Sequence, residues 1–122
     1  MYDIFGSDIS SNKVTLSGMV FSKREVDVLS FICSGRPHKV VAEALNLSVR
    51  TVETHVRNIV GKSGLGSMDR LLEHLTKTGD VHLLKKVYVH VLFMNDFNDF
   101  IKTLGRFKIS LSVFGDSLND RR

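Results

Sequence analysis

The sequence predicts a mainly α fold, with four short helices in residues 21–76 and a small α+β, or wholly helical, appendage over residues 80–122. Capping and helix-stopping residues recur at short intervals through the first segment, and its apolar residues recur at steps of three and four. Beyond it the composition changes to β-branched and aromatic runs. Residues 1–17 are polar, and residues 1–20 are expected to form a flexible lead, with one short strand near residues 14–16.

The composition is that of a folded protein. Of 122 residues, 43% are hydrophobic and 25% are charged, which excludes a disordered chain, and the net charge of +4 is a mild bias toward polyanions. A single cysteine, Cys33, excludes an intrachain disulfide and suits a reducing cytoplasm, where we expect the protein to reside. Neither a secretory signal nor a membrane-spanning apolar run is found, so we expect no membrane partner.

The first helix is expected to begin at Ser22. This serine can accept a hydrogen bond from the free amides of the first turn, and Glu25 stands where a capping-box partner reaches back. Gly35 suits the left-handed position after a helix, and Pro37 suits the start of the next segment, so the helix should end near Ser34.

A tight corner is expected between the second and third helices. The second helix covers about residues 38–45, Asn46 tolerates the positive φ of a sharp turn, and Ser48 can cap the third helix. The apolar stripe predicted to pack inward consists of Val49, Val52, Val56 and Ile59. The opposite, polar face carries Arg50, Thr51, Thr54, Arg57 and Asn58.

The fourth helix is expected after Ser67, once Lys62 and Gly64 have closed the third. Its apolar edge is formed by Leu71, Leu72 and Leu75. Beyond residue 80, β-branched and aromatic residues favour a strand at 87–93, a helix at 95–104 and an alternating strand at 107–113. Periodicity leaves a longer helix over 81–94 as an open alternative.

Two short helices joined by a tight corner, the second with two arginines on its outer face, are the minimum for reading a DNA major groove. The literal residues of Ser22–Leu29, Val41–Ser48 and Thr51–Ile59, together with Gly35, resemble the LuxR/GerE family of bacterial transcription regulators. The resemblance runs from Phe21 to about residue 75. It implies a helix-turn-helix domain whose third helix, at 48–62, binds double-stranded DNA. The function that this implies is the control of transcription, without catalysis.

When the family's DNA-contacting positions are transferred to this sequence, the resemblance implies that Glu53, Thr54 and Arg57 contact base edges. It implies contacts to the DNA backbone by Lys39, Ser48, Thr51 and His55. Arg57 can donate two hydrogen bonds to a guanine edge, whereas Lys39 and Arg50 suit phosphate neutralisation. The complete set predicted to contact DNA is Lys39, Ser48, Arg50, Thr51, Glu53, Thr54, His55, Arg57 and Asn58.

A homodimer is expected. The family's fourth helix often makes the dimer contact, but Ser63 and Met68 depart from its pattern, as does Phe21 in place of a leucine. The apolar segment 80–122 is too small to bury itself, so we expect it to hold two subunits together. The residues predicted to dimerise are Leu71, Leu72, Leu75, Val89, Val91 and Phe93.

Other functions compete with this interpretation. Residues 109–118 resemble the nucleophile block of GDSL esterases, which would make Ser117 a nucleophile, but the Asp-x-x-His block of that family is missing. We therefore expect no enzyme. The histidines share no metal-ligand spacing with cysteines or carboxylates, so neither a metal nor another cofactor is expected. The alternative to DNA binding is an interaction protein that uses the bundle and the appendage to bind another regulatory protein.

Overall fold

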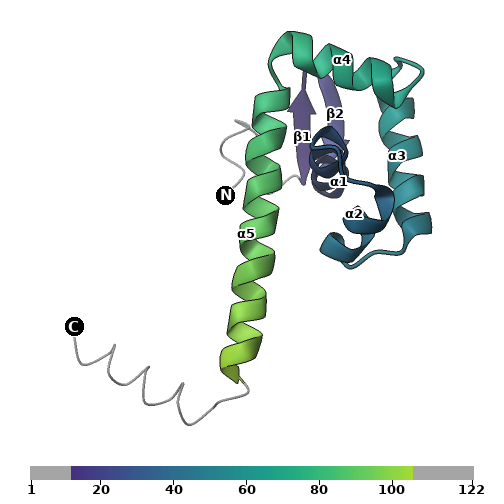
Figure 1. Ribbon diagram of the computed structural model, residues 1–122. Helices are drawn as coiled ribbons and strands as arrows, with labels where there is room; N and C mark the ends of the chain where they lie inside the picture. Colours follow the sequence, from purple (N-terminus) through teal and green to yellow (C-terminus); the bar gives the residue numbers. More distant parts are fainter. Residues whose placement is uncertain (1–11, 106–122) are drawn as a thin grey trace. The chain divides into compact units, whose positions relative to one another are not determined.

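The computed structural model describes residues 12–105, and in this range five helices follow a two-stranded hairpin (Figure 1). The mainly α prediction is confirmed. The elements are β1 (Lys13–Leu16), β2 (Met19–Ser22), α1 (Lys23–Cys33), α2 (His38–Leu45), α3 (Val49–Ser63), α4 (Met68–Thr78) and α5 (Val81–Gly105). The chain divides into two compact units, Met1–Val91 and Leu92–Arg122, with the boundary inside α5. No helix in the described range is long and apolar enough to cross a membrane.

The hairpin is built on a two-residue turn. Ser17 and Gly18 both have positive φ, of 50° and 79°, which is the signature of a type I′ turn between antiparallel strands. Val14 pairs with Phe21 across the strands, and both are buried together with Leu16, because alternate residues of a strand face the same side. One face of the hairpin therefore belongs to the core.

The predicted strand near residues 14–16 is confirmed, but the prediction of a flexible lead is wrong for residues 13–20. The second strand, Met19–Ser22, was not expected, because a Ser-Gly pair is a weaker hairpin signal than Asn-Gly. Pairing of the two strands gives hydrogen-bond partners to backbone N–H and C=O groups that a single strand would leave without one, and this orders the segment.

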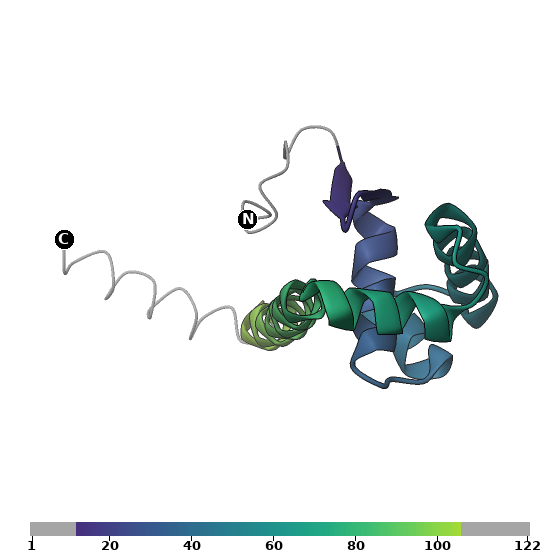
Figure 2. The same ribbon diagram turned by 90° about the horizontal axis from the view of Figure 1, so that it is seen from above.

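Helix α1 is the central helix of the first unit. Its predicted capping box is present: the Ser22 Oγ accepts from the Glu25 N–H at 3.1 Å, and the Glu25 Oε1 accepts from the Ser22 N–H at 2.8 Å. Every residue from Glu25 to Phe31 is buried, which is the pattern of a helix surrounded by other elements. The hairpin, α2 and α3 all contact it. Figure 2 shows α4 passing above α1 between α3 and α5.

The hairpin and all five helices contribute to one apolar core. Its buried members are Val14, Leu16, Phe21, Val26, Val28, Leu29, Phe31, Val41, Ala42, Leu45, Val52, Ile59, Leu71, Leu75, Leu84, Val87 and Val91. The three contributed by α5 recur at steps of three and four, so one stripe of this helix packs inward.

The strand predicted at 87–93 is wrong, because these residues lie within the continuous helix α5. The helical alternative for 81–94 and the helix predicted at 95–104 are both confirmed as parts of α5. Burial of one helical stripe against the core outweighs the β preference of valine and aromatic residues. The strand predicted at 107–113 lies outside the described residues.

Two polar connections fix the start of α5 to the rest of the first unit. The Tyr88 ring meets the Phe31 ring edge-on at 4.9 Å, and its hydroxyl accepts from the Arg36 Nε at 2.7 Å. At the α4–α5 corner, the Ser17 hydroxyl is hydrogen-bonded to the Thr78 hydroxyl at 2.8 Å and donates to Asp80. Contacts distant in sequence thus hold α5 as a helix.

Candidate nucleic-acid interface

The corner between α2 and α3 has the predicted chemistry. Asn46 adopts the left-handed conformation, with φ of 59° and ψ of 43°, and the next N–H, of Leu47, donates to the Ala42 carbonyl at 2.8 Å. The Ser48 Oγ then accepts from the Thr51 N–H at 3.0 Å and caps α3. These bonds fix the direction in which α3 leaves the corner.

The inner face of α3 is narrower than predicted. Val52 and Ile59 are fully buried and Val56 is partly buried, as expected. Val49, however, is 41% exposed, so its place in the buried stripe is wrong. It is the first residue of α3 and lies on the flank of the stripe, beyond the reach of the core.

The outer face of α3 carries a short chain of hydrogen bonds. The Thr54 hydroxyl donates to the Arg50 carbonyl at 3.1 Å and accepts from the Arg57 Nη2 at 3.2 Å. The guanidinium of Arg57 is thereby held along the helix, and its other N–H groups are available to a ligand. The exposed side chains of this face are Arg50, Glu53, Thr54, Arg57 and Asn58.

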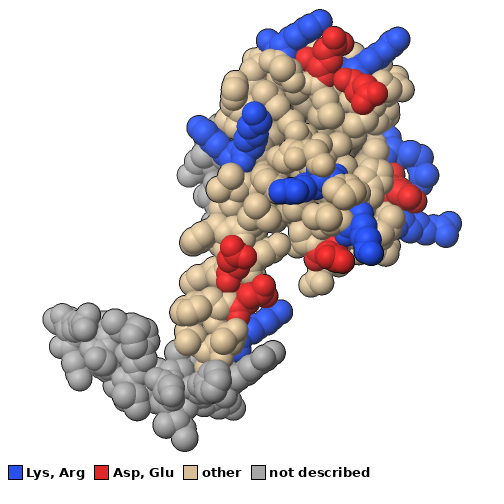
Figure 3. Space-filling view, viewed as in Figure 1, with Lys and Arg blue, Asp and Glu red and all other residues tan. Residues whose placement is uncertain are grey.

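The other side chains predicted to contact DNA lie on α2, at the α2–α3 corner and on the flank of α3. Lys39 is exposed on α2, and Ser48 is exposed at the corner, where its hydroxyl is engaged in the cap. Thr51 and His55 are half-buried on the flank of α3. Basic and acidic side chains alternate along the margin that α3 occupies in Figure 1, as Figure 3 shows. The fold therefore places the predicted residues on α2, on α3 and at the corner between these two helices.

An ion pair that the sequence did not signal joins α3 to α1. The Lys62 Nζ donates to the Glu25 Oε1 at 2.7 Å, and the Glu25 side chain is only 6% exposed. Burial raises the pKa of Glu25, but hydrogen bonds from Lys62 and Ser22 and the Lys62 charge outweigh burial, so the pKa lies below its ordinary value of 4.5. The end of α3 is thus fixed to the start of α1.

Replacing Lys62 with methionine is expected to lower the free energy of unfolding by about 1–3 kcal/mol at pH 7, because Glu25 stays buried without its cation. The loss is expected to be smaller than for a fully buried ion pair, because the Lys62 side chain is partly exposed to solvent. Since the Glu25 pKa is lowered in the folded state, the pair's contribution is fully present above 4.5 and is lost as the pH falls through the lowered value.

Urea unfolding of both proteins at pH 7 and near pH 3 checks this. The gap between wild type and Lys62→Met is expected to shrink in acid. Lys77→Met is the matched control, because Lys77 lies 3.9 Å from Glu73 and both side chains are largely exposed. A gap of equal size at both pH values would contradict the assigned role of the Glu25 carboxylate.

Ser63 and Met68, the two residues before and at the start of α4 that depart from the family's pattern, both make contacts in the structure. The Ser63 hydroxyl donates to the Val60 carbonyl at 2.7 Å and accepts from the Leu65 N–H at 3.1 Å, so it closes α3 by polar contacts. Met68 is partly buried against the core. Helix α4 thus packs on the core although Ser63 and Met68 depart from the family's pattern.

The residues predicted to dimerise fall into two groups. Leu71 and Leu75 are fully buried and Val91 is 9% exposed, so these three lie in the core of their own chain. Leu72 is half-buried, whereas Val89 and Phe93 are each 62% exposed. Among the residues predicted to dimerise, Val89 and Phe93 on α5 thus leave the most surface for a second copy.

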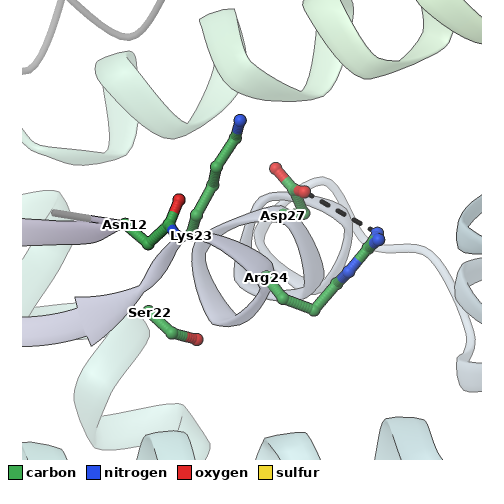
Figure 4. Close-up of a pocket in the computed structure, with 5 residues that line it drawn as sticks. All are labelled: Asn12, Ser22, Lys23, Arg24 and Asp27. Atoms are coloured by element: carbon green, nitrogen blue, oxygen red, sulfur yellow. Dashed lines mark ion pairs between the residues drawn. The ribbon is translucent and has the colours of Figure 1, made fainter. Parts of the chain in front are cut away.

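A shallow pocket of about 360 Å³ lies at the start of α1 (Figure 4). It is lined by Asn12, Ser22, Lys23, Arg24 and Asp27, none of which was predicted to contact DNA. Arg24 turns toward Asp27, at 3.8 Å. Within residues 12–105, no three His, Cys, Asp or Glu side chains gather as metal ligands. Ser117, the residue of the esterase interpretation, lies outside the described residues.

Comparisons with known proteins identify the segment that carries this corner. Residues 19–74 match the family model described as bacterial regulatory proteins, luxR family. The chain is 39% identical over 80 residues to the Fimbriae Z protein of Escherichia coli K12, covering 60% of this chain and 38% of that protein. It is 43% identical over 58 residues to the oxygen regulatory protein NreC of Staphylococcus aureus JH9, covering 48% and 27%.

The chain thus spans less than two fifths of the length of either relative. No solved structure matches it. The matched segment contains β2, α1, α2 and α3 and most of α4, and so includes the whole α2–α3 corner. Residues 19–74 of this chain are therefore similar to the luxR family of bacterial regulatory proteins.

Proposed function

We propose that the protein binds double-stranded DNA through the α2–α3 corner and thereby regulates transcription, with α3 as the recognition helix. The observation that carries the proposal is the outer face of α3, where Arg50, Thr54 and Arg57 are exposed and joined by hydrogen bonds on a helix whose other face is fixed in the core. The match of residues 19–74 to the luxR family model of bacterial regulatory proteins supports it.

The chemistry of this face divides into two roles. Lys39 at the start of α2 and Arg50 at the start of α3 are cations suited to phosphate oxygens, which set position without reading sequence. Arg57 lies two turns further along α3, and its fork of donors suits the O6 and N7 atoms of guanine. Because the Thr54 hydroxyl is engaged with Arg50 and Arg57, its methyl group is the part left for an apolar contact with thymine.

Titration of the full chain with a mixed-sequence duplex at several salt concentrations tests the proposal. Phosphate contacts release condensed counterions, so the logarithm of affinity is expected to fall linearly with the logarithm of salt concentration. Arg50→Ala is expected to reduce the slope by about one. Lys77→Ala removes a similar charge at the α5 end of α4 and is expected to leave the slope unchanged.

Binding that does not depend on salt, or that Lys77→Ala weakens as much as Arg50→Ala, would contradict the proposal. Absence of duplex binding at low salt would favour the alternative, an interaction protein that binds another regulatory protein. The exposed apolar residues of α5 are the feature that such a partner would use.

A further inference from the structure

The C-terminal part of α5 exposes a concentration of aromatic side chains. Phe93, Phe97 and Phe100 are 62%, 46% and 57% exposed, and Ile101 is also exposed. The rings of Phe93 and Phe97 already lie stacked, with centroids 6.4 Å apart and planes 16° apart. Soluble helices expose single apolar residues routinely, but clustered rings of this size mark an interaction surface.

The spacing of this cluster is that of a helix-pairing seam. Phe93, Phe97, Phe100 and Leu104 follow one another at steps of four, three and four, which are alternating d and a positions of a heptad. We call these four residues the aromatic seam. The stripe that α5 buries in the first unit ends at Val91, only two residues before Phe93, so the seam is not a continuation of that stripe.

We propose that the aromatic seam binds the same seam of a second copy of this chain, with the two helices antiparallel. A 4-3-4 spacing is the same when read in either direction, so a two-fold axis between the copies places each seam residue opposite another. Phe97 then faces Phe100 of the second copy, and Phe93 faces Leu104 of the second copy. No charged residue enters the seam in this register.

Charge distribution along α5 favours the antiparallel orientation. In a parallel pair, each a or d residue faces the same residue of the second copy. Continued toward the N-terminus, the heptad pattern of the aromatic seam places His90 and Lys86 at the next two such positions. A parallel pair would therefore bring two Lys86 ammonium groups together beside the contact, which is repulsive. The antiparallel register moves these residues away from their own copies.

Light scattering of the full chain from low to high micromolar concentration tests the seam. The wild type is expected to be a dimer. Phe97→Glu, in the middle of the seam, is expected to raise the dissociation constant by about tenfold or more, because a carboxylate would be buried without a partner. Val20→Glu is the matched control, since Val20 is 50% exposed on β2, and this variant is expected to dimerise like the wild type.

Circular dichroism and thermal melting of both variants establish that the fold is retained, as expected for substitutions at exposed positions. A monomeric wild type would overturn the proposal, as would a Phe97→Glu variant that dimerises as tightly as Val20→Glu. A monomer would instead mean that the seam is covered by its own chain or by another protein.

Disulfide trapping tests the orientation. In a Cys33→Ser background, Phe93→Cys and Leu104→Cys are made separately and oxidised alone or mixed. The antiparallel register brings these two positions together across the interface, so a cross-linked dimer is expected in the mixture and in neither variant alone. Cross-linking of each variant with itself would show a parallel pair and overturn the proposed register. The experiment needs no DNA, so it stands or falls independently of DNA binding.

Discussion

Val52→Asp is expected to unfold the first unit or to bring it close to unfolding. Val52 has no exposed surface and lies in the middle of the face with which α3 packs on the core. An aspartate there would be buried without a partner, at a cost of about 3–5 kcal/mol. Small domains are stable by about 5–15 kcal/mol in total, so a large share of the free energy of unfolding would be lost, and most of it at the lower end of that range.

Thermal and urea unfolding followed by circular dichroism measure this effect. Val49→Asp is the matched control, because it makes the same change three residues earlier on the same helix. Val49 is exposed and is the first residue of α3, where a negative charge is favourable to the helix dipole. The control is expected to melt near the wild type. Equal melting of Val52→Asp and wild type would show that α3 does not pack as described.

The second large effect is expected in DNA recognition. Arg57→Ala is expected to cost about 1–3 kcal/mol on the preferred duplex and much less on mixed sequence, because base-edge hydrogen bonds are lost while phosphate contacts remain. Thr54→Val keeps the shape and the methyl group but removes the hydroxyl that holds Arg57 at 3.2 Å. It is expected to lower discrimination in the same direction by a smaller amount.

Selection of bound sequences from a random duplex pool identifies the preferred site, and fluorescence anisotropy then compares affinities on that site and on mixed sequence. Lys39→Ala is the reference variant, since loss of a phosphate contact is expected to weaken all sequences alike. If Arg57→Ala and Lys39→Ala lose the same amount on every sequence, the division into base-reading and phosphate-binding roles is wrong.

Local chemistry explains why so much of the helical bundle could be predicted from the sequence. Capping by Ser22 and Ser48, the left-handed Asn46 and the polar face of α3 each depend on residues within a few positions of one another. Such local interactions can be recognised from the sequence alone, so the bounds of α1, α2 and α3 were predicted to within a residue or two. The outward direction of Thr54 and Arg57 followed from the same periodicity.

Where partners are distant in the chain, only the tertiary structure decided the outcome. The Lys62–Glu25 pair joins residues 37 positions apart, and no local pattern connects them. The sequence pattern of Leu71 and Leu75 does not tell which surface covers them, and in the tertiary structure both lie in the core of their own chain. Residues 87–93 have strand composition, yet burial of Val87 and Val91 with Leu84 made them helical, because packing energy exceeds intrinsic β preference.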